Sequence, residues 1–243
     1  MNISRIWHVS DLHERRNPDH NRAVREKLAA IPFDPASDLV IVTGDLTDDG
    51  SEAQYAQVRQ HLLPFAGRIV ICPGNHDYGP LGNLYDSAAV KRFDKLRDAL
   101  GAHKVLDGGP VRVLALDTCL RTANPFDFAR GRLGWWQGKR IEWFCAACER
   151  AGVQSVIAMH HTPFDASWAL RLVDADRLLR VAEGRASLVL VGHEHKERHV
   201  RNKRDGDRGD RTYWISAPSL ARDGADPILI SPSDQLVRPR RTA

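Results

Sequence analysis

Residues 69–77 have the sequence IVICPGNHD, a short apolar run followed at once by a polar loop. The same arrangement recurs along the chain, and short runs of apolar, β-branched residues bounded by Gly and Pro are typical of buried strands. The runs are Arg5–Val9, Leu39–Val42, Ile69–Cys72, Val153–Met159 and Leu188–Val191. We therefore expect a strand at each of these runs, with a polar loop directly after it.

Segments with helical periodicity lie between these runs. They cover Arg22–Ile31, Ser51–Leu63, Ser87–Leu100, Leu133–Arg150 and Asp174–Glu183. Alternation of strands and helices predicts an α/β fold, and a further apolar run at Val111–Asp117 is expected to start a second sheet. Ligands in α/β folds bind beyond the carboxyl ends of the strands, so the polar loops are expected to converge on one site.

The length of 243 residues suits one α/β domain spanning residues 1–243, and no internal repeat or linker divides the chain. The charged segment Lys196–Arg211 precedes an apolar run, Tyr213–Ser216, which predicts a charged hairpin at about 196–215. A solvated hairpin is the simpler expectation. A substrate-specificity or oligomer contact is the alternative, because the segment follows His195 directly. The basic tail from about residue 238 is expected to be frayed.

The composition, with 42% hydrophobic and 27% charged residues, is that of a globular protein and excludes collagen, coiled-coil and disordered classes. The net charge of +4 fits either an ordinary Arg-rich surface or a field that attracts anionic substrates. Four cysteines do not make a disulfide framework. No secretory signal and no apolar run long enough for a membrane span is visible, so a cytoplasmic protein without membrane association is expected.

The polar loops supply a set of side chains that could bind metal ions. They are Asp11, His13, Asp45, Asn75, His160, His193 and His195. Asp11 and His13 are two residues apart, so in extended backbone both project to the same side, and the same holds for His193 and His195. Five loops that each follow a strand favour a ligand set over solvated loop residues or helix caps.

Mixed imidazole and carboxylate ligands suit transition metals such as Mn, Fe or Zn. The set is too large for one ion with open positions, and it fits two divalent ions about 3.5–4 Å apart that share one carboxylate. Two such ions would hold a bridging hydroxide, a nucleophile that is ready at neutral pH because metal binding lowers the pKa of water to near 7. The same ions would neutralise charge that builds up on a phosphate in the transition state.

The pattern of these loops resembles the calcineurin-like metallophosphoesterase superfamily from residue 10 to about residue 195. The matching elements are Asp11-x-His13, Gly44-Asp45, Gly74-Asn75-His76-Asp77, His160 and Gly192-His193-x-His195. The resemblance implies a four-layer αββα sandwich of two mixed β-sheets flanked by helices. It also implies that the chain hydrolyses phosphate esters by attack of the metal-bridging hydroxide.

The resemblance further implies a role for each site residue. One ion would be held by Asp11, His13 and His195, the other by Asn75, His160 and His193, and both by Asp45. His76 would be the general acid beside the leaving group, and Asp77 would orient it. A positioned acid contributes roughly 10²–10⁴-fold to the rate.

Some segments are similar to one branch of the superfamily, the bacterial class III cyclic-nucleotide phosphodiesterase group. These segments are GDLTDDG at 44–50, HHTP at 160–163 and GRLG at 131–134. Protein Ser/Thr phosphatases carry Arg-Gly after the bridging Asp, where this chain has Leu46-Thr47. UDP-diacylglucosamine hydrolases usually have Arg in the place of His76. A phosphodiesterase is therefore expected, with cyclic nucleotides among its candidate substrates.

Other functions remain open. A phosphomonoesterase or a nuclease could use the same site, and a non-catalytic scaffold could share the fold. A small phosphate-ester substrate is the expected partner, because the short chain leaves little room for a region that contacts nucleic acid. The sequence leaves the oligomeric state open, with a homodimer as one option.

His161 follows His160 directly and is expected to point away from the metals, packed or hydrogen-bonded. The alternatives are that His161 holds a metal ligand in position, or that it replaces His160 as the ligand. Cys145 and Cys148 have the spacing of a redox pair, but their apolar helical context favours plain packing.

Three tryptophans follow Gly134 on the expected helix. Trp135, Trp136 and Trp143 are spaced so that Trp143 shares a face with the other two. Packing into the core is expected for them, with base stacking as the alternative.

Overall fold

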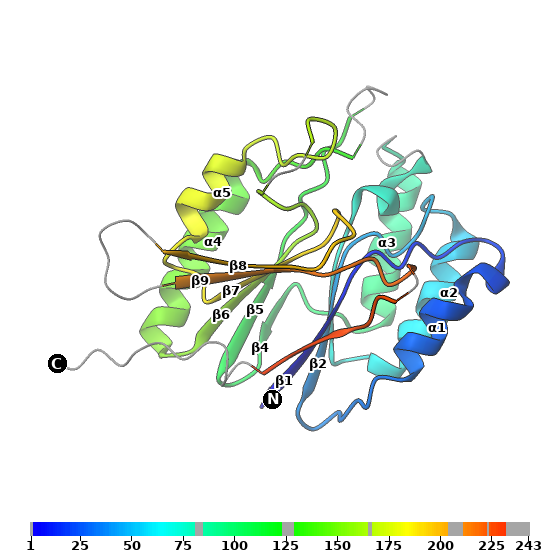
Figure 1. Ribbon diagram of the computed structural model, residues 1–243, viewed down its shortest axis with the longest axis horizontal. Coiled ribbons are helices and arrows are strands. Elements are labelled where there is room, and N and C mark those ends of the chain that lie inside the picture. The colour runs from blue at the N-terminus through cyan, green and yellow to red at the C-terminus, as the bar shows by residue number, and fades with distance from the viewer. Residues whose placement is uncertain are drawn as a thin grey trace.

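The computed structural model describes residues 2–80, 85–122, 129–164, 167–203, 211–222 and 224–231. In this part of the chain two β-sheets pack against each other, and helices cover the outer face of each sheet (Figure 1). The expected α/β class and the four-layer sandwich of two mixed sheets are confirmed.

The first sheet has the strand order β10-β1-β2-β3. Its strands are β1 (Arg5–Val9), β2 (Asp38–Thr43), β3 (Ile69–Cys72) and β10 (Ile228–Ile230). β1, β2 and β3 run parallel, whereas β10 pairs antiparallel with β1 at the edge. The three parallel strands therefore end on the same side of the sheet.

The second sheet has the order β4-β5-β6-β7-β9-β8. Its strands are β4 (Val105–Asp107), β5 (Val111–Ala115), β6 (Gln154–Ala158), β7 (Leu188–Val191), β9 (Arg211–Ser216) and β8 (Arg198–Lys203). The inner strands β5, β6, β7 and β9 are parallel, and the edge strands β4 and β8 pair antiparallel.

Two groups of helices flank the sheets. The helices are α1 (Arg22–Ala29), α2 (Glu52–Leu62), α3 (Ser87–Ala99), α4 (Gly134–Ala151) and α5 (Ala175–Ala182). Short 3₁₀ turns add η1 (Pro18–Asn21), η2 (Leu63–Phe65) and η3 (Asn75–Tyr78). Figure 1 shows α1, α2 and α3 beside the first sheet, and α4 and α5 beside the second.

The parallel strands are buried on both faces, which explains their almost continuous apolar sequences. In β2, Leu39 and Ile41 pack between the two sheets, whereas Val40 and Val42 pack against the helices of the first sheet. The two pairs lie on opposite faces of the sheet because successive side chains of a strand point to opposite sides. This packing fixes the strands on both sides and holds the loops at their ends in place.

The tryptophans of α4 do not pack into the core, so that expectation was wrong. Trp135, Trp136 and Trp143 are 50%, 71% and 64% exposed. The buried face of α4 is formed instead by small and aliphatic residues. These residues are Gly138, Ile141, Cys145 and Cys148. The two cysteines are buried, as plain packing requires.

The segment after His195 forms β8, which pairs antiparallel with β9. Residues 204–210, at the expected tip of the charged hairpin, lie outside the described residues, as does the basic tail from about 238. Among the residues that the structure describes, no helix is both long and apolar enough to cross a membrane. That residues 1–243 form a single domain remains a prediction.

Candidate metal centre

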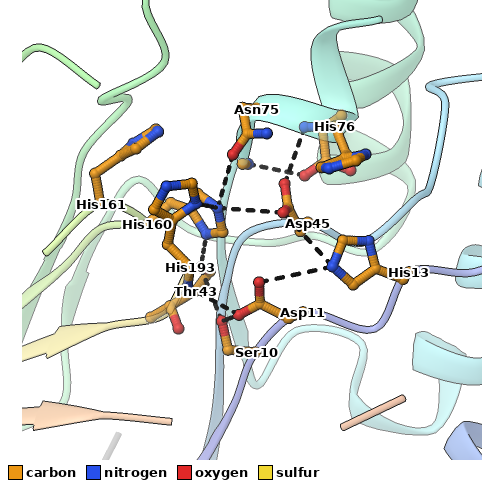
Figure 2. Close-up of polar contacts among 12 residues, drawn as sticks. Ser10, Asp11, His13, Thr43, Asp45, Asn75, His76, His160, His161 and His193 are labelled. Atoms are coloured by element: carbon orange, nitrogen blue, oxygen red, sulfur yellow. Dashed lines mark hydrogen bonds and ion pairs between the residues drawn. The ribbon is translucent and has the colours of Figure 1, made fainter. Parts of the chain in front are cut away.

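The polar loops that follow β1, β2, β3, β6 and β7 meet where the two sheets come together. Backbone hydrogen bonds join them in pairs: Asp11 N donates to Gly44 O at 3.0 Å, and Gly192 N donates to His160 O at 2.9 Å. All the predicted site residues lie in one cluster, most of them labelled in Figure 2. The convergence expected from strand order therefore holds.

The backbone at this cluster has a conformation that side chains rarely adopt. Five of the predicted ligands have positive φ: Asp11 at 53°, His13 at 45°, Asp45 at 50°, His193 at 74° and His195 at 57°. Such a conformation costs of order 1–3 kcal/mol per residue and persists only where the surroundings impose it. Strain gathered at one cluster is typical of a functional site.

Glycines beside the ligands permit close approach of the loops. A Cβ on Gly44 would lie 2.5 Å from Nδ1 of His160, and one on Gly74 would lie 2.2 Å from Oδ1 of Asp45. A Cβ on Gly192 would lie 1.9 Å from the Ser10 hydroxyl oxygen. The glycines that precede the ligands in the sequence are therefore required by packing.

The first group of ligand atoms comes from Asp11, His13, Asp45 and His195. Nε2 of His195 lies 3.1 Å from Nε2 of His13 and 3.1 Å from Oδ1 of Asp11. Oδ2 of Asp45 lies 3.7 Å from Nε2 of His13. These atoms are close enough to share one cation.

The second group comes from Asn75, His160, His193 and again Asp45. Nε2 of His160 lies 3.2 Å from Oδ1 of Asn75, 3.1 Å from Nδ1 of His193 and 3.3 Å from Oδ2 of Asp45 (Figure 2). Oδ2 of Asp45 therefore faces both groups, which is the position that a bridging carboxylate needs.

The hydrogen bonds that the imidazoles donate to backbone carbonyls decide which ring nitrogens carry a lone pair. Nδ1 of His160 donates to the carbonyl of Thr43 at 2.7 Å, and Nε2 of His193 donates to the carbonyl of Leu170 at 3.1 Å. The remaining nitrogens then face each other with lone pairs, an arrangement that is repulsive unless a cation or a proton lies between them. Oδ1 of Asp11 is buried without a hydrogen-bond partner among the described residues. This donor set fits metal ions.

The electrostatics of the cluster also favour cation binding. Burial opposes charge on Asp11, but His195 and His160 outweigh it and lower the pKa of the carboxyl to about 2. Burial and the neighbouring His160 lower the pKa of His193 to about 3, so this imidazole is neutral and able to bind a metal. Burial works against a charged His160 too, yet Asp45 and Asp11 raise its pKa to about 9. The carboxylates thus attract positive charge to this cluster.

His76 lies beside the first group, with its ring 4.9 Å from the ring of His13. Its Nδ1 donates to the carbonyl of Asp48 at 2.8 Å, and its backbone N donates to Oδ1 of Asp45 at 2.9 Å. Burial lowers the pKa of His76, but the Asp45 carboxylate and the Asp48 carbonyl outweigh burial, so the pKa is raised. The ring is thus held in place and favoured in its protonated form.

Asp77 does not orient the His76 ring, which corrects that expectation. Its carboxylate accepts hydrogen bonds from the backbone N of Leu46, Thr47 and Gly74 at 3.2, 3.0 and 2.9 Å. Burial and the nearby Asp45 raise the pKa of Asp77 to about 7. Asp77 therefore ties together two ligand-bearing loops, and the Asp48 carbonyl takes the role expected for it.

His161 lies behind the ligands. Its Nδ1 is 2.8 Å from the Thr118 hydroxyl, and Figure 2 places its ring on the far side of His160 and His193 from Asp45. The residue is fully buried. Its Nδ1 hydrogen bond fits the packed role, but its ligand atoms also lie within 4.8 Å of those of His160 and His193, so a supporting role or a role as a ligand stays a prediction.

Several groups that hold the ligands were missed from the sequence. The Ser10 hydroxyl donates to Oδ2 of Asp11 at 2.5 Å, and His193 N donates to the same oxygen at 3.0 Å, which leaves Oδ1 for a metal. The Thr43 and Leu170 carbonyls hold two imidazoles, as described above. Ser10 could have been suspected from its place before Asp11, whereas nothing in the sequence marks Leu170.

Comparisons with known proteins agree with this geometry. The family model for calcineurin-like phosphoesterases matches residues 4–197. A probable cyclic nucleotide phosphodiesterase of Coxiella burnetii is 26% identical over 238 residues, which cover 90% of this chain and 84% of that protein. The 3′,5′-cyclic adenosine monophosphate phosphodiesterase of Escherichia coli K12 is 27% identical, with 68% of this chain and 57% of that protein covered.

A glycerophosphodiester phosphodiesterase of Enterobacter lignolyticus is likewise 27% identical, over 78% of this chain and 70% of that protein. Among solved structures, a dimetal phosphatase from Danio rerio superposes with a TM-score of 0.65 at 11% identity, and covers 91% of this chain and 89% of that one. That likeness shows the fold. The match to the family model over most of the sequence, together with the cluster at the strand ends, identifies the chain as a member of the calcineurin-like phosphoesterase family.

Proposed function

We propose that this protein is a metal-dependent phosphodiesterase that acts on small phosphate esters. The observation that carries the proposal is the pair of ligand groups that share Oδ2 of Asp45. In the second group, Nε2 of His160 and Nδ1 of His193 lie only 3.1 Å apart. One charged carboxylate between two such groups is the arrangement expected of a two-metal site.

The ligand roles follow from the two groups of atoms. One ion would be held by Asp11, His13 and His195, the other by Asn75, His160 and His193, and both by Asp45. Divalent ions of Mn, Fe or Zn, when bound, would neutralise charge on the phosphate and lower the pKa of water. Ser10 and the Thr43 and Leu170 carbonyls orient the ligands.

His76 would act as the general acid. Because Nδ1 donates to the Asp48 carbonyl, Nε2 is the nitrogen that can release a proton to the departing alkoxide. Asp45 and the Asp48 carbonyl raise the pKa of the imidazole against the effect of burial, which favours the protonated form that an acid needs. Leaving groups that are poor without protonation would depend on it most.

A preference for diesters is supported by the names of the relatives and by the GDLTDDG and HHTP segments. The relatives named for cyclic nucleotides and for glycerophosphodiesters define two substrate families to compare. We place cyclic nucleotides first, because a relative whose match covers 90% of this chain bears that name.

The test is a substrate panel on protein loaded separately with Mn, Fe and Zn. Bis-p-nitrophenyl phosphate, p-nitrophenyl phosphate, cyclic AMP, glycerophosphocholine and single-stranded DNA are hydrolysed in parallel, and bound metal is measured by mass spectrometry. We expect about two ions per chain and faster turnover of diesters than of the monoester. Faster hydrolysis of the monoester would favour a phosphomonoesterase, and the absence of bound metal under every condition would favour a scaffold.

A further inference from the structure

A cavity of about 470 Å³ lies directly beside the first ligand group. His195 forms part of its wall, and Nε2 of the same residue is 3.1 Å from Oδ1 of Asp11. Glu197, two residues after His195, also lines the cavity. The rest of the wall comes from the segment after β9, which includes Pro218, Arg222 and Asp226, and from the start of β10 at Ile228. A phosphate ester bound at the ligand groups would therefore have room for one substituent in this cavity.

The segment that forms the cavity is tied to the metal centre. Ser219 Oγ donates to the carbonyl of Asp11 at 2.9 Å, and Leu220 N donates to the carbonyl of Ser10 at 3.0 Å. Nζ of Lys27 donates to the carbonyls of Leu220 and Arg222 at 2.9 and 2.5 Å. The backbone that carries Arg222 is thus held in a fixed position next to the metal ligands, as a preformed binding site requires.

The lining of the cavity indicates which substituent fits. Pro218, Pro227 and Ile228 offer apolar surface, Arg222 offers hydrogen-bond donors, and the carboxylates of Glu197 and Asp226 offer acceptors. A second phosphate would be repelled by these two carboxylates, and an alkyl chain would make no use of Arg222. A nucleoside has an apolar ring face together with donors and acceptors on its edge and sugar. The cavity volume lies within the usual range for small-molecule sites, roughly 300–1,000 Å³.

We propose that this cavity binds the nucleoside substituent of a phosphodiester substrate and that Arg222 determines the preference for it. The inference rests on the proposed function and adds to it a specificity site that lies outside the ligand set. Arg222 is exposed at the rim of the cavity, so its replacement should not disturb the core.

Two esters with the same leaving group test the proposal. Thymidine 5′-p-nitrophenyl phosphate and methyl p-nitrophenyl phosphate both release p-nitrophenolate, and they differ only in the substituent that the cavity would bind. We expect kcat/KM to be at least about tenfold higher for the nucleoside ester, and Arg222→Ala to lower that ratio about tenfold, the usual effect of one hydrogen bond to a charged group. Arg180→Ala, an exposed arginine on α5, should leave the ratio unchanged.

A binding measurement gives a second readout. Isothermal titration of metal-loaded protein with 5′-AMP and with methyl phosphate should show tighter binding of 5′-AMP, and Arg222→Ala should remove most of that difference. If the ratio of kcat/KM for the two esters were equal in the parent and in Arg222→Ala, the specificity site would be overturned. Hydrolysis of the methyl ester would in that case still support the proposed function. Failure to hydrolyse either ester would instead overturn the proposed function, and the inference with it.

Discussion

Asp45 is the residue on which both ligand groups depend. Its Oδ2 lies 3.7 Å from Nε2 of His13 and 3.3 Å from Nε2 of His160, and its Oδ1 is held by the backbone N of His76 at 2.9 Å. One side chain thus couples two clusters and the loop of the proposed acid. A change at Asp45 should affect all three at once.

Asp45→Asn should lower metal content more than loss of a ligand that faces only one group. We expect well under one bound ion per chain in Asp45→Asn, against about one remaining ion per chain in His195→Ala, because an amide lacks the charge that two neighbouring cations need. Metal per chain, measured by mass spectrometry after dialysis, checks this. Asp107→Asn, at an exposed carboxylate in β4, is the matched control. Full retention of both ions in Asp45→Asn would refute the bridging role.

His76→Ala should separate good from poor leaving groups. Turnover of cyclic AMP, whose alkoxide must be protonated, should fall roughly 10²–10⁴-fold, whereas hydrolysis of a p-nitrophenyl diester should fall far less. Metal content should stay the same, since His76 is not placed among the ligands. His20→Ala, at an exposed histidine in η1, serves as the control. An equal loss with both substrates would show that His76 is not the acid.

Residue roles were predictable from the sequence to different extents. The predicted ligands lie together because their loops all follow parallel strands, which brings the loops of each sheet to one edge, and because the two sheets pack with these edges side by side. The role of Asp77 was not predictable, because its three backbone donors come from loops whose path depends on tertiary packing. The same holds for the Leu170 carbonyl, which any residue could supply.

At the scale of elements, the loops at the strand ends lie so close together that only glycine fits at some positions. Gly192 directly follows β7, and a Cβ at this position would collide with the Ser10 hydroxyl and the Asp11 carboxylate, which belong to the loop after β1. The loops of the two sheets are therefore in close contact at the metal centre. A methyl group added there must move one loop or the other.

Gly192→Ala should damage the metal centre without a change in any ligand. The new Cβ would lie 1.9 Å from Ser10 Oγ and 2.7 Å from Oδ2 of Asp11, so we expect a loss of about 1–3 kcal/mol in stability and weaker metal binding. Thermal denaturation and metal titration measure both effects. Gly138→Ala on α4, where the nearest atom is 3.5 Å away, should be neutral or slightly stabilising. Identical behaviour of the two variants would refute the crowding argument.

The helix α4 shows where sequence patterns fail at this scale. Its tryptophans share a face, but so do Gly138, Ile141 and Cys145, and hydrophobicity alone favoured the wrong face. The buried face carries smaller side chains than the tryptophan face, and Gly138 on that face lies opposite Arg177 of α5. Helix bounds, by contrast, were within a few residues, because caps and periodicity are local.

At the scale of the whole molecule, a buried histidine outside the ligand set links stability to pH. His8 in β1 is fully buried, and its Nε2 is 2.9 Å from the Thr43 hydroxyl. Burial, partly opposed by Asp11, lowers the pKa of His8 to about 3. Below pH 6.5, His8 therefore binds a proton in the unfolded chain but not in the folded chain. His8 thus lowers the free energy of unfolding as pH falls from 6.5 towards 3.

The lowered pKa of His8 predicts how the free energy of unfolding changes with pH. Between pH 7 and pH 5 the metal-free parent should lose about 2 kcal/mol of unfolding free energy relative to His8→Gln, which has no such proton to bind. Urea denaturation at both pH values measures the difference, and the His20→Gln variant, at an exposed position, should follow the parent. Parallel slopes in the parent and in His8→Gln would show that the His8 pKa is not lowered by folding.

The order of the ligands along the chain has a consequence for how the protein is made. The side chains of His13 and His195 that meet at 3.1 Å are 182 residues apart in sequence. A ribosome that adds roughly 5–20 residues per second would expose the early ligands many seconds before the late ones. On the proposed function, no nascent fragment that stops before residue 195 could hold both ions. Metal acquisition would then be a late event, governed by the free ions present where synthesis ends.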